Sequence, residues 1–124
     1  MSAPSRVEKI QSILYNLSHT TPDITGSALV NTDGFVIASL LQRDVDEDLV
    51  AGMATTIFSV GERISAKLLS SVLEQTYVRT PAGYILIHAV SEDMMLVCLT
   101  SKHAKLGLIF LEVKSHARQL ASLL

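Results

Sequence analysis

Three residues in the C-terminal half of the chain carry side chains that could do nucleophilic or metal chemistry: His88, Cys98 and His103. A thiol activated by an imidazole is a nucleophile, and both residue types bind zinc. His88 lies within an apolar run, however, where a histidine is most often a packed side chain, and Cys98 is most simply a small buried hydrophobe. We therefore expect no catalytic residue and no enzyme. The enzyme alternative is a small hydrolase using Cys98 and a histidine, and a thiol that does not react in the folded protein contradicts it.

A run of acidic residues, Asp44 followed by Asp46, Glu47 and Asp48, has the composition of a metal-binding loop. Calcium loops alternate oxygen ligands with a turn glycine, and this run has no such glycine. Acidic residues at the start of a helix instead cap its free N–H groups and interact favourably with its dipole. The run therefore predicts a helix start, and we expect neither a metal site nor a cofactor.

The glycines and the basic residues also argue against two common functions. The six glycines are isolated from one another and form neither a phosphate-binding loop followed by lysine and Ser/Thr nor a dinucleotide fingerprint. The basic residues are scattered and are not interleaved with stacking aromatics, as they are in many nucleic-acid-binding proteins. We expect the chain neither to hydrolyse nucleotides itself nor to bind nucleic acid.

The overall composition is that of a compact soluble domain. The chain has 124 residues, a formal net charge of −2 and 48% hydrophobic residues. This length supports one core, so we expect one domain over residues 1–124 with Met1–Pro4 frayed. No apolar run approaches the roughly 18 to 20 residues that cross a bilayer, and the N-terminus is too polar for a secretion signal. We therefore expect a cytoplasmic protein without direct membrane insertion.

Hydrophobic periodicity and turn residues predict eight elements. In order they are a helix capped by Ser5 and ending near Ser18, strands Ile24–Val30 and Phe35–Leu41, the helix Asp46–Leu69, strands Gln75–Thr80, Tyr84–Val90 and Met94–Thr100, and a helix capped by Ser101 that runs to the C-terminus. This order predicts an α+β fold with a five-stranded antiparallel sheet and helices on its faces. The polar strand Gln75–Thr80 is expected at a sheet edge and the two strands after it centrally.

The long helix carries more apolar surface than one contact with a core needs. One row is expected to lie on the core: Leu49, Met53, Ile57, Val60 and Ile64. A second row of small or apolar residues lies beside it: Ala54, Phe58, Gly61 and Ser65, bordered by Val50, Leu68 and Leu69. A chain this short has few other elements to cover the second row, so we expect it to pack against a second copy. The alternative is a helix buried between elements of its own chain.

Four segments, in this order and spacing, resemble the roadblock, or dynein light-chain-like, family. They are the hairpin Ser27–Ala38, Gly61-Glu62-Arg63 in the long helix, the strand Gly83–Ile87, and Ala104–Leu108 opening the last helix. The resemblance covers nearly the whole chain and is greatest to the prokaryotic branch that includes the gliding-motility GTPase regulator MglB. It implies a three-layer α/β/α fold, profilin- or longin-like.

The resemblance also implies a homodimer. In the family, the third strands of two subunits pair into one continuous sheet and the long helices lie side by side across a two-fold axis. Combined with the second row of the helix, this gives an expected dimer interface: Val50, Ala54, Phe58, Gly61, Ser65, Gln75, Thr76, Tyr77, Val78 and Arg79.

Prokaryotic members resemble partners and regulators of small Ras-like GTPases, which implies that this chain modulates GTP hydrolysis, for example as a GTPase-activating protein in signalling. The implied contact surface is the remaining arc of the helix: Asp48, Gly52, Thr55, Ser59, Glu62 and Arg63. Arg63 could act as an arginine finger, but a solvated or ion-paired arginine is the favoured interpretation. The alternative function is a dimeric scaffold subunit of a larger motility, transport or signalling assembly, without effect on hydrolysis. Heterodimerisation with a paralogue also stays open.

Overall fold

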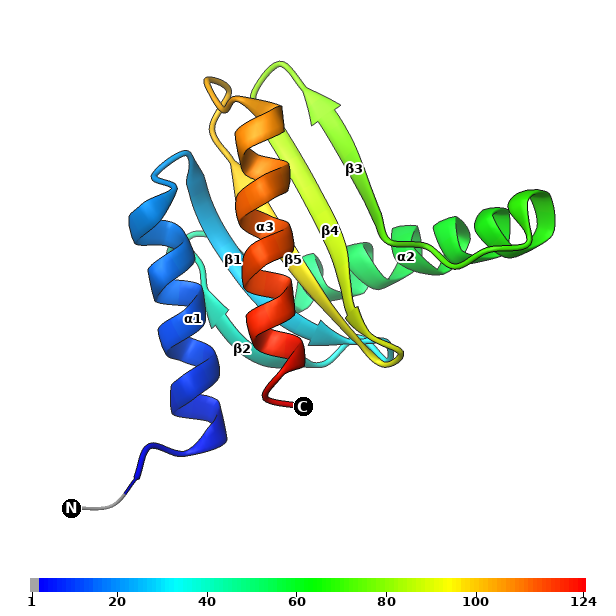
Figure 1. The fold of residues 1–124 in the computed structure, drawn as a ribbon. Helices are drawn as coiled ribbons and strands as arrows, with labels where there is room; N and C mark the ends of the chain where they lie inside the picture. Colours follow the sequence, from blue (N-terminus) through cyan, green and yellow to red (C-terminus); the bar gives the residue numbers. More distant parts are fainter. Residues whose placement is uncertain (1–2) are drawn as a thin grey trace.

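The computed structural model describes residues 3–124 and has three layers, with a five-stranded sheet between α1 and α3 on one face and α2 on the other (Figure 1). The helices are α1 (Arg6–Thr20), α2 (Glu47–Leu69) and α3 (Leu106–Ala121). The strands are β1 (Ile24–Asn31), β2 (Val36–Leu40), β3 (Gln75–Thr80), β4 (Gly83–Ser91) and β5 (Met94–Thr100). All neighbouring strands are antiparallel, in the order β2-β1-β5-β4-β3. The predicted fold class and element order are confirmed.

The segment Met1–Pro4 was expected to be frayed. Two of its residues, Met1 and Ser2, lie outside the described residues. Within residues 3–124, no helix combines the length and the apolar character that a bilayer crossing requires.

Side-chain caps fix the starts of α1 and α2 where the sequence predicted them. The Ser5 hydroxyl accepts a hydrogen bond from the Glu8 N–H at 3.1 Å. The Asp46 carboxylate accepts from the N–H groups of Asp48 and Leu49, at 3.0 and 3.2 Å. These bonds satisfy backbone donors that have no partner inside the helix. The acidic run is therefore a helix cap, as predicted.

The predicted cap of the last helix is wrong. The helix begins at Leu106, after Lys105, and no side chain caps it. The Ser101 hydroxyl instead donates to the Asp23 carboxylate at 2.9 Å, and the Ser101 N–H donates to the Asp23 carbonyl at 2.8 Å. Ser101 is therefore committed to a contact with the loop before β1, and the helix starts five residues later.

The larger core lies between the sheet and the pair α1 and α3. Its fully buried side chains come from both helices and from three strands, β1, β4 and β5, with Ala38 of β2 and Ala117 of α3 beside them: Ile10, Leu14, Leu17, Ile24, Leu29, Leu86, Leu96, Cys98, Ile109, Val113 and Leu120. Burying large aliphatic side chains stabilises a fold by about 1.5–3 kcal/mol each. This face of the sheet is the main source of stability.

The smaller core lies under α2, and here the predicted assignment of the two helix rows is wrong. Ala51, Ala54 and Phe58 are buried against Ala28, Val30, Ile87, Met95 and Val97 of the sheet. The row predicted to lie on the core is largely exposed, with exposed fractions of 57% for Leu49 and 61% for Met53. The small side chains of Ala51 and Ala54 let α2 approach the bulky side chains of the sheet closely.

The two edge strands differ in how their free backbone groups are used. The Gln11 amide on α1 donates to the Ser39 carbonyl of β2 at 2.7 Å. In residues 3–124, no side chain forms a hydrogen bond to the backbone of β3. An uncovered edge strand offers its N–H and C=O groups to another strand. The prediction that Gln75–Thr80 is an edge strand is confirmed, and β3 is the less protected of the two edges.

Replacing Gly83 by alanine should strongly destabilise the fold. Gly83 has φ +142, and a Cβ at this position would overlap the Thr100 carbonyl of the adjacent strand. We expect a loss on the order of 3 kcal/mol in the free energy of unfolding. Gly52→Ala is the matched control, because no atom lies within 4 Å of its Cβ position. A helix-interior alanine there should gain up to about 1 kcal/mol. Urea denaturation measures both, and similar midpoints for the two variants would contradict the placement of Gly83.

Candidate functional site

No hydrogen bond joins Cys98 to His88 or His103 in residues 3–124. Cys98 is fully buried, and burial raises the pKa of its thiol from 9.0 to about 12. His103 is exposed in the loop before α3, and the His88 ring Nδ1 lies 2.8 Å from the carbonyl of Ala89. No group of three or more His, Cys, Asp or Glu in the described part of the chain is placed to hold a metal ion. A thiolate is needed for nucleophilic attack, and burial disfavours it here.

The most buried histidine is one that the sequence analysis did not single out. His116 is 3% exposed, with Nε2 at 3.1 Å from the Asn16 amide and Nδ1 at 2.7 Å from the Glu112 carbonyl. Because Nδ1 donates to that carbonyl, Nε2 accepts the Asn16 N–H, and the ring ties α1 to α3. Its spacing three residues after Val113 and four before Leu120 places it on the buried side of α3, which is the signal that could have revealed it.

The exposed apolar residues of α2 form a continuous row along the helix. This apolar row consists of Leu49, Met53, Ile57, Val60, Ile64 and Leu68, and all but the partly buried Ile57 have exposed fractions between 43% and 76%. Exposed apolar side chains are common singly, but a contiguous set on one side of a helix is typical of an interaction surface.

The second half of α2 extends past its own sheet. Phe58 is the last buried residue of the helix. Figure 1 shows the helix beginning behind β1 and β2 and continuing beyond β3, before the chain turns back at Ser70–Glu74. The residues that follow Phe58, Ser59–Leu69, are called the projecting end. It carries half of the apolar row.

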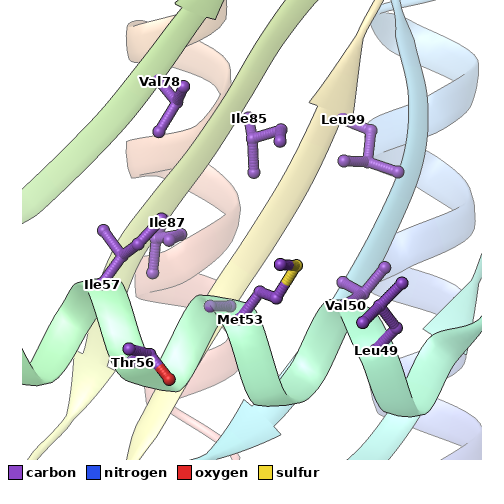
Figure 2. A pocket seen from close by; sticks show the side chains of 10 residues that line it. Leu49, Val50, Met53, Thr56, Ile57, Val78, Ile85, Ile87 and Leu99 are labelled. Atoms are coloured by element: carbon purple, nitrogen blue, oxygen red, sulfur yellow. The ribbon is translucent and has the colours of Figure 1, made fainter.

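An apolar groove lies between the first half of α2 and the uncovered part of the sheet. Its volume is about 490 Å³. Figure 2 shows Val78, Ile85 and Leu99 of the sheet facing Met53 and Ile57 of α2 across open space. The other lining residues are Leu49, Val50, Ala54, Thr56 and Ile87. Thr56 is the one polar residue among them, so the groove suits an apolar surface rather than a polar ligand.

Some residues of the predicted dimer interface are used for contacts within the chain itself. Ala54 and Phe58 are each only 4% exposed and belong to the chain's own core. A Cβ on Gly61 would lie 2.8 Å from the Leu73 side chain, so the close approach at Gly61 is made within the chain. Ala54 and Phe58 are therefore not free to contact a partner, whereas Gly61 stays partly exposed. Val50 and Ser65 stay partly exposed.

The β3 part of the predicted interface lies at the free edge of the sheet. Tyr77 and Arg79 are exposed, whereas Gln75, Thr76 and Val78 are partly buried. Strand alternation separates two neighbours: Val78 lines the groove, and the Tyr77 ring lies 5.6 Å from that of Phe110 on α3. The structure thus brings β3, the groove and the projecting end to one edge of the molecule.

The six residues predicted to contact a GTPase share the remaining side of α2. All of this polar arc is exposed except Thr55, which is partly buried: Asp48, Gly52, Thr55, Ser59, Glu62 and Arg63. The Thr55 hydroxyl donates to the Ala51 and Gly52 carbonyls, at 3.0 and 2.9 Å. Within residues 3–124, no ion pair joins Arg63 to Glu62, so the guanidinium is solvated.

Cys98 should not react with thiol reagents in the folded protein at neutral pH. The side chain is inaccessible, and a pKa of about 12 leaves almost no thiolate. We expect no maleimide adduct by mass spectrometry in buffer and full labelling in concentrated urea. Rapid labelling in the native state would instead support the hydrolase alternative.

Comparisons with known proteins agree on the family. Residues 11–100 match the model of the Roadblock/LC7 domain. An uncharacterized protein of Methanocaldococcus jannaschii is 36% identical over 114 residues, which cover 92% of this chain and 98% of that protein. A second uncharacterized protein of the same organism has the same identity over 92% of this chain and 95% of its own length.

Solved structures share the fold at low sequence identity. MglB of Myxococcus xanthus has a TM-score of 0.86 and 19% identity, over all of this chain and 96% of its own. The gliding protein MglB of Thermus thermophilus has the same TM-score and identity, over 99% of this chain and 93% of its own. Profilin IA of Acanthamoeba castellanii is more distant, with a TM-score of 0.66 and 14% identity over 90% of this chain and 96% of its own. The chain belongs to the Roadblock/LC7 family and has the MglB- and profilin-like fold.

Proposed function

We propose that the chain is a homodimeric binding partner of a small Ras-like GTPase and modulates its GTP hydrolysis through the polar arc of the paired long helices. The observation that carries the proposal is the division of α2 into three sides. One side packs on the sheet, one is the exposed apolar row, and the third is the exposed polar arc. Membership of the Roadblock/LC7 family and the likeness to MglB support the same role.

Self-association is supported by two surfaces that a lone chain leaves unused. The apolar row is accessible to a partner, and β3 is the less protected sheet edge. Burying several large aliphatic side chains of the row would contribute about 1.5–3 kcal/mol each. One MglB structure of TM-score 0.87 and 17% identity has a tetrameric arrangement, so assembly occurs within this fold.

The polar arc suits a reversible contact with another protein. It carries two carboxylates, one guanidinium and small side chains, and such mixed, mildly charged surfaces are typical of non-obligate interfaces. Arg63 lies on a helix rather than on a mobile loop, which makes insertion into a partner's active site difficult. We therefore propose that the surface acts by positioning the GTPase's own loops, not by supplying a catalytic group.

GTP hydrolysis by the small Ras-like GTPases of the same genome, with and without this protein, tests the proposal. We expect one of them to hydrolyse GTP faster in its presence, and pull-downs to recover the GTP-loaded form in preference to the GDP-loaded form. Ser59→Tyr should weaken this binding about tenfold or more, because the ring would occupy the centre of the polar arc. Ser115→Tyr, at an exposed position on α3, is the matched control. Binding without a rate change would favour the scaffold alternative.

Arg63→Ala separates positioning from an arginine finger. If Arg63 only contributes to the contact surface, stimulation of hydrolysis should fall by less than about tenfold and recover at saturating protein concentration. Loss of an arginine finger costs about 10³-fold or more in kcat and does not recover. Single-turnover hydrolysis at several protein concentrations distinguishes the two. A drop of the larger size would overturn the positioning mechanism.

A further inference from the structure

We infer that a pocket at one end of the sheet, near the start of α3, binds the phosphate group of a phosphomonoester. The pocket has a volume of about 430 Å³ and lies between the turn that joins β3 to β4 and the loop that follows β5. Figure 1 shows this turn and this loop side by side at the end of the sheet where α3 begins. We call it the basic pocket, and its lining residues are Arg79, Thr80, Pro81, Tyr84 and Lys102. The inference does not depend on the proposed function.

Two cationic side chains in the basic pocket have no anionic partner of their own. Arg79 and Lys102 are exposed, and no salt bridge involves either of them within residues 3–124. The carboxylate tied to the same loop, that of Asp23, accepts a hydrogen bond from the Ser101 hydroxyl at 2.9 Å. The first turn of α3, which follows this loop, contains no acidic residue. The pocket therefore combines a concave shape with positive charge that is not neutralised, and this favours an anionic ligand.

Hydrogen bonds within the chain hold the walls of the basic pocket in place. In the β3–β4 turn, the Thr80 hydroxyl donates to the Gly83 carbonyl at 3.0 Å and accepts from the Ala82 N–H at 3.1 Å. At the start of β4, the Tyr84 N–H donates to the Thr100 hydroxyl of β5 at 3.0 Å. The loop after β5 is bonded in turn to the loop before β1. A site that is already formed loses less conformational entropy when a ligand binds.

Arg79 and Tyr84 project from the same face of the sheet. They are cross-strand partners in the β3–β4 register, and such partners lie about 5 Å apart at Cβ. The Tyr77 ring packs against the rings of Tyr84 and Phe110, with centroids 6.3 and 5.6 Å apart, so this is the α3 face of the sheet. Pairing of β3 with another strand would use backbone groups in the plane of the sheet and leave Arg79 on this face.

A phosphomonoester fits the chemistry of the basic pocket better than other small anions do. The Arg79 guanidinium can donate two parallel hydrogen bonds to phosphate oxygens, and the Lys102 ammonium supplies a second positive charge. A phosphomonoester carries close to two negative charges at neutral pH, whereas a carboxylate or a phosphodiester carries one. The volume is in the range of small-molecule sites, and Pro81 and the Tyr84 ring supply apolar walls. The phosphate therefore belongs to a small organic molecule or to a lipid headgroup.

Amide chemical shifts of the full chain, titrated with glycerol 3-phosphate and with dimethyl phosphate, test this inference. We expect saturable shifts with glycerol 3-phosphate, confined to residues 79–84 and 101–106, and binding of the diester weaker by about tenfold or more because it carries one charge. Arg79→Gln and Lys102→Gln should each weaken binding of glycerol 3-phosphate about tenfold. Lys114→Gln is the matched control, because it removes the same charge from an exposed position on α3. It should bind as the wild type does.

Flotation with vesicles distinguishes the two sources of the phosphate. The vesicles are phosphatidylcholine alone, phosphatidylcholine with phosphatidic acid, which is a monoester, and phosphatidylcholine with phosphatidylglycerol, which is a diester. Flotation with phosphatidic acid only, lost in Arg79→Gln and Lys102→Gln, would support the inference and identify a lipid headgroup. Binding of glycerol 3-phosphate without flotation would support it and identify a soluble phosphomonoester.

Three results would overturn the inference. The first is binding of neither glycerol 3-phosphate nor phosphatidic acid vesicles by the wild type. The second is equal weakening by Lys114→Gln and by the two pocket variants, since this would show a general effect of charge. The third is a set of shifts that leaves the amides of residues 79–84 and 101–106 unchanged, because the phosphate would then bind elsewhere on the chain.

Discussion

The length of α2 relative to the width of the sheet constrains everything else in this molecule. A helix of 23 residues is about 35 Å long, whereas five strands span about 19 Å across the sheet. The start of the helix is fixed at the β2 edge, where the Ser39 hydroxyl donates to the Glu47 carboxylate at 2.7 Å. A helix that starts at one edge and crosses the sheet must leave it at the other. The projecting end, with half of the apolar row, and the free β3 edge lie at that exit, and Val78 of β3 forms one wall of the groove.

Most of the fold could be predicted from the sequence because its signals are local. The Ser5 and Asp46 caps each join a side chain to backbone groups two or three residues further along the chain. The start of α3 could not, because the Ser101 side chain is used by Asp23, far away in sequence. Sequence spacing offers no means to foresee such a tertiary competitor for a helix cap.

The sequence analysis identified the apolar and polar sides of α2 but assigned the wrong apolar row to the core. Periodicity identified two apolar rows on α2, but both satisfy the same spacing, and only the shape of the opposing sheet decides between them. The bulky side chains of Ile87, Met95 and Val97 leave room for alanines, so the row with the larger residues turns outward. The groove had no sequence signal, since it needs side chains from three strands and one helix at once. The polar arc was identified because its residues occupy the part of the helix surface that neither apolar row includes.

The bond between Gln11 and the Ser39 carbonyl has a consequence for how large an assembly can become. Sheets that add strands at both edges grow without limit, as fibres do. Here the Gln11 side chain of α1 bonds to a carbonyl of the edge strand β2, whereas β3 at the other edge receives no side-chain bond to its backbone within residues 3–124. Two chains joined at β3 would present only β2 at both outer ends, each held by its own α1. The outer strands of such a sheet would each already have one backbone carbonyl bonded to a side chain of α1, so the β2 edge is the less suited of the two to accept a further strand.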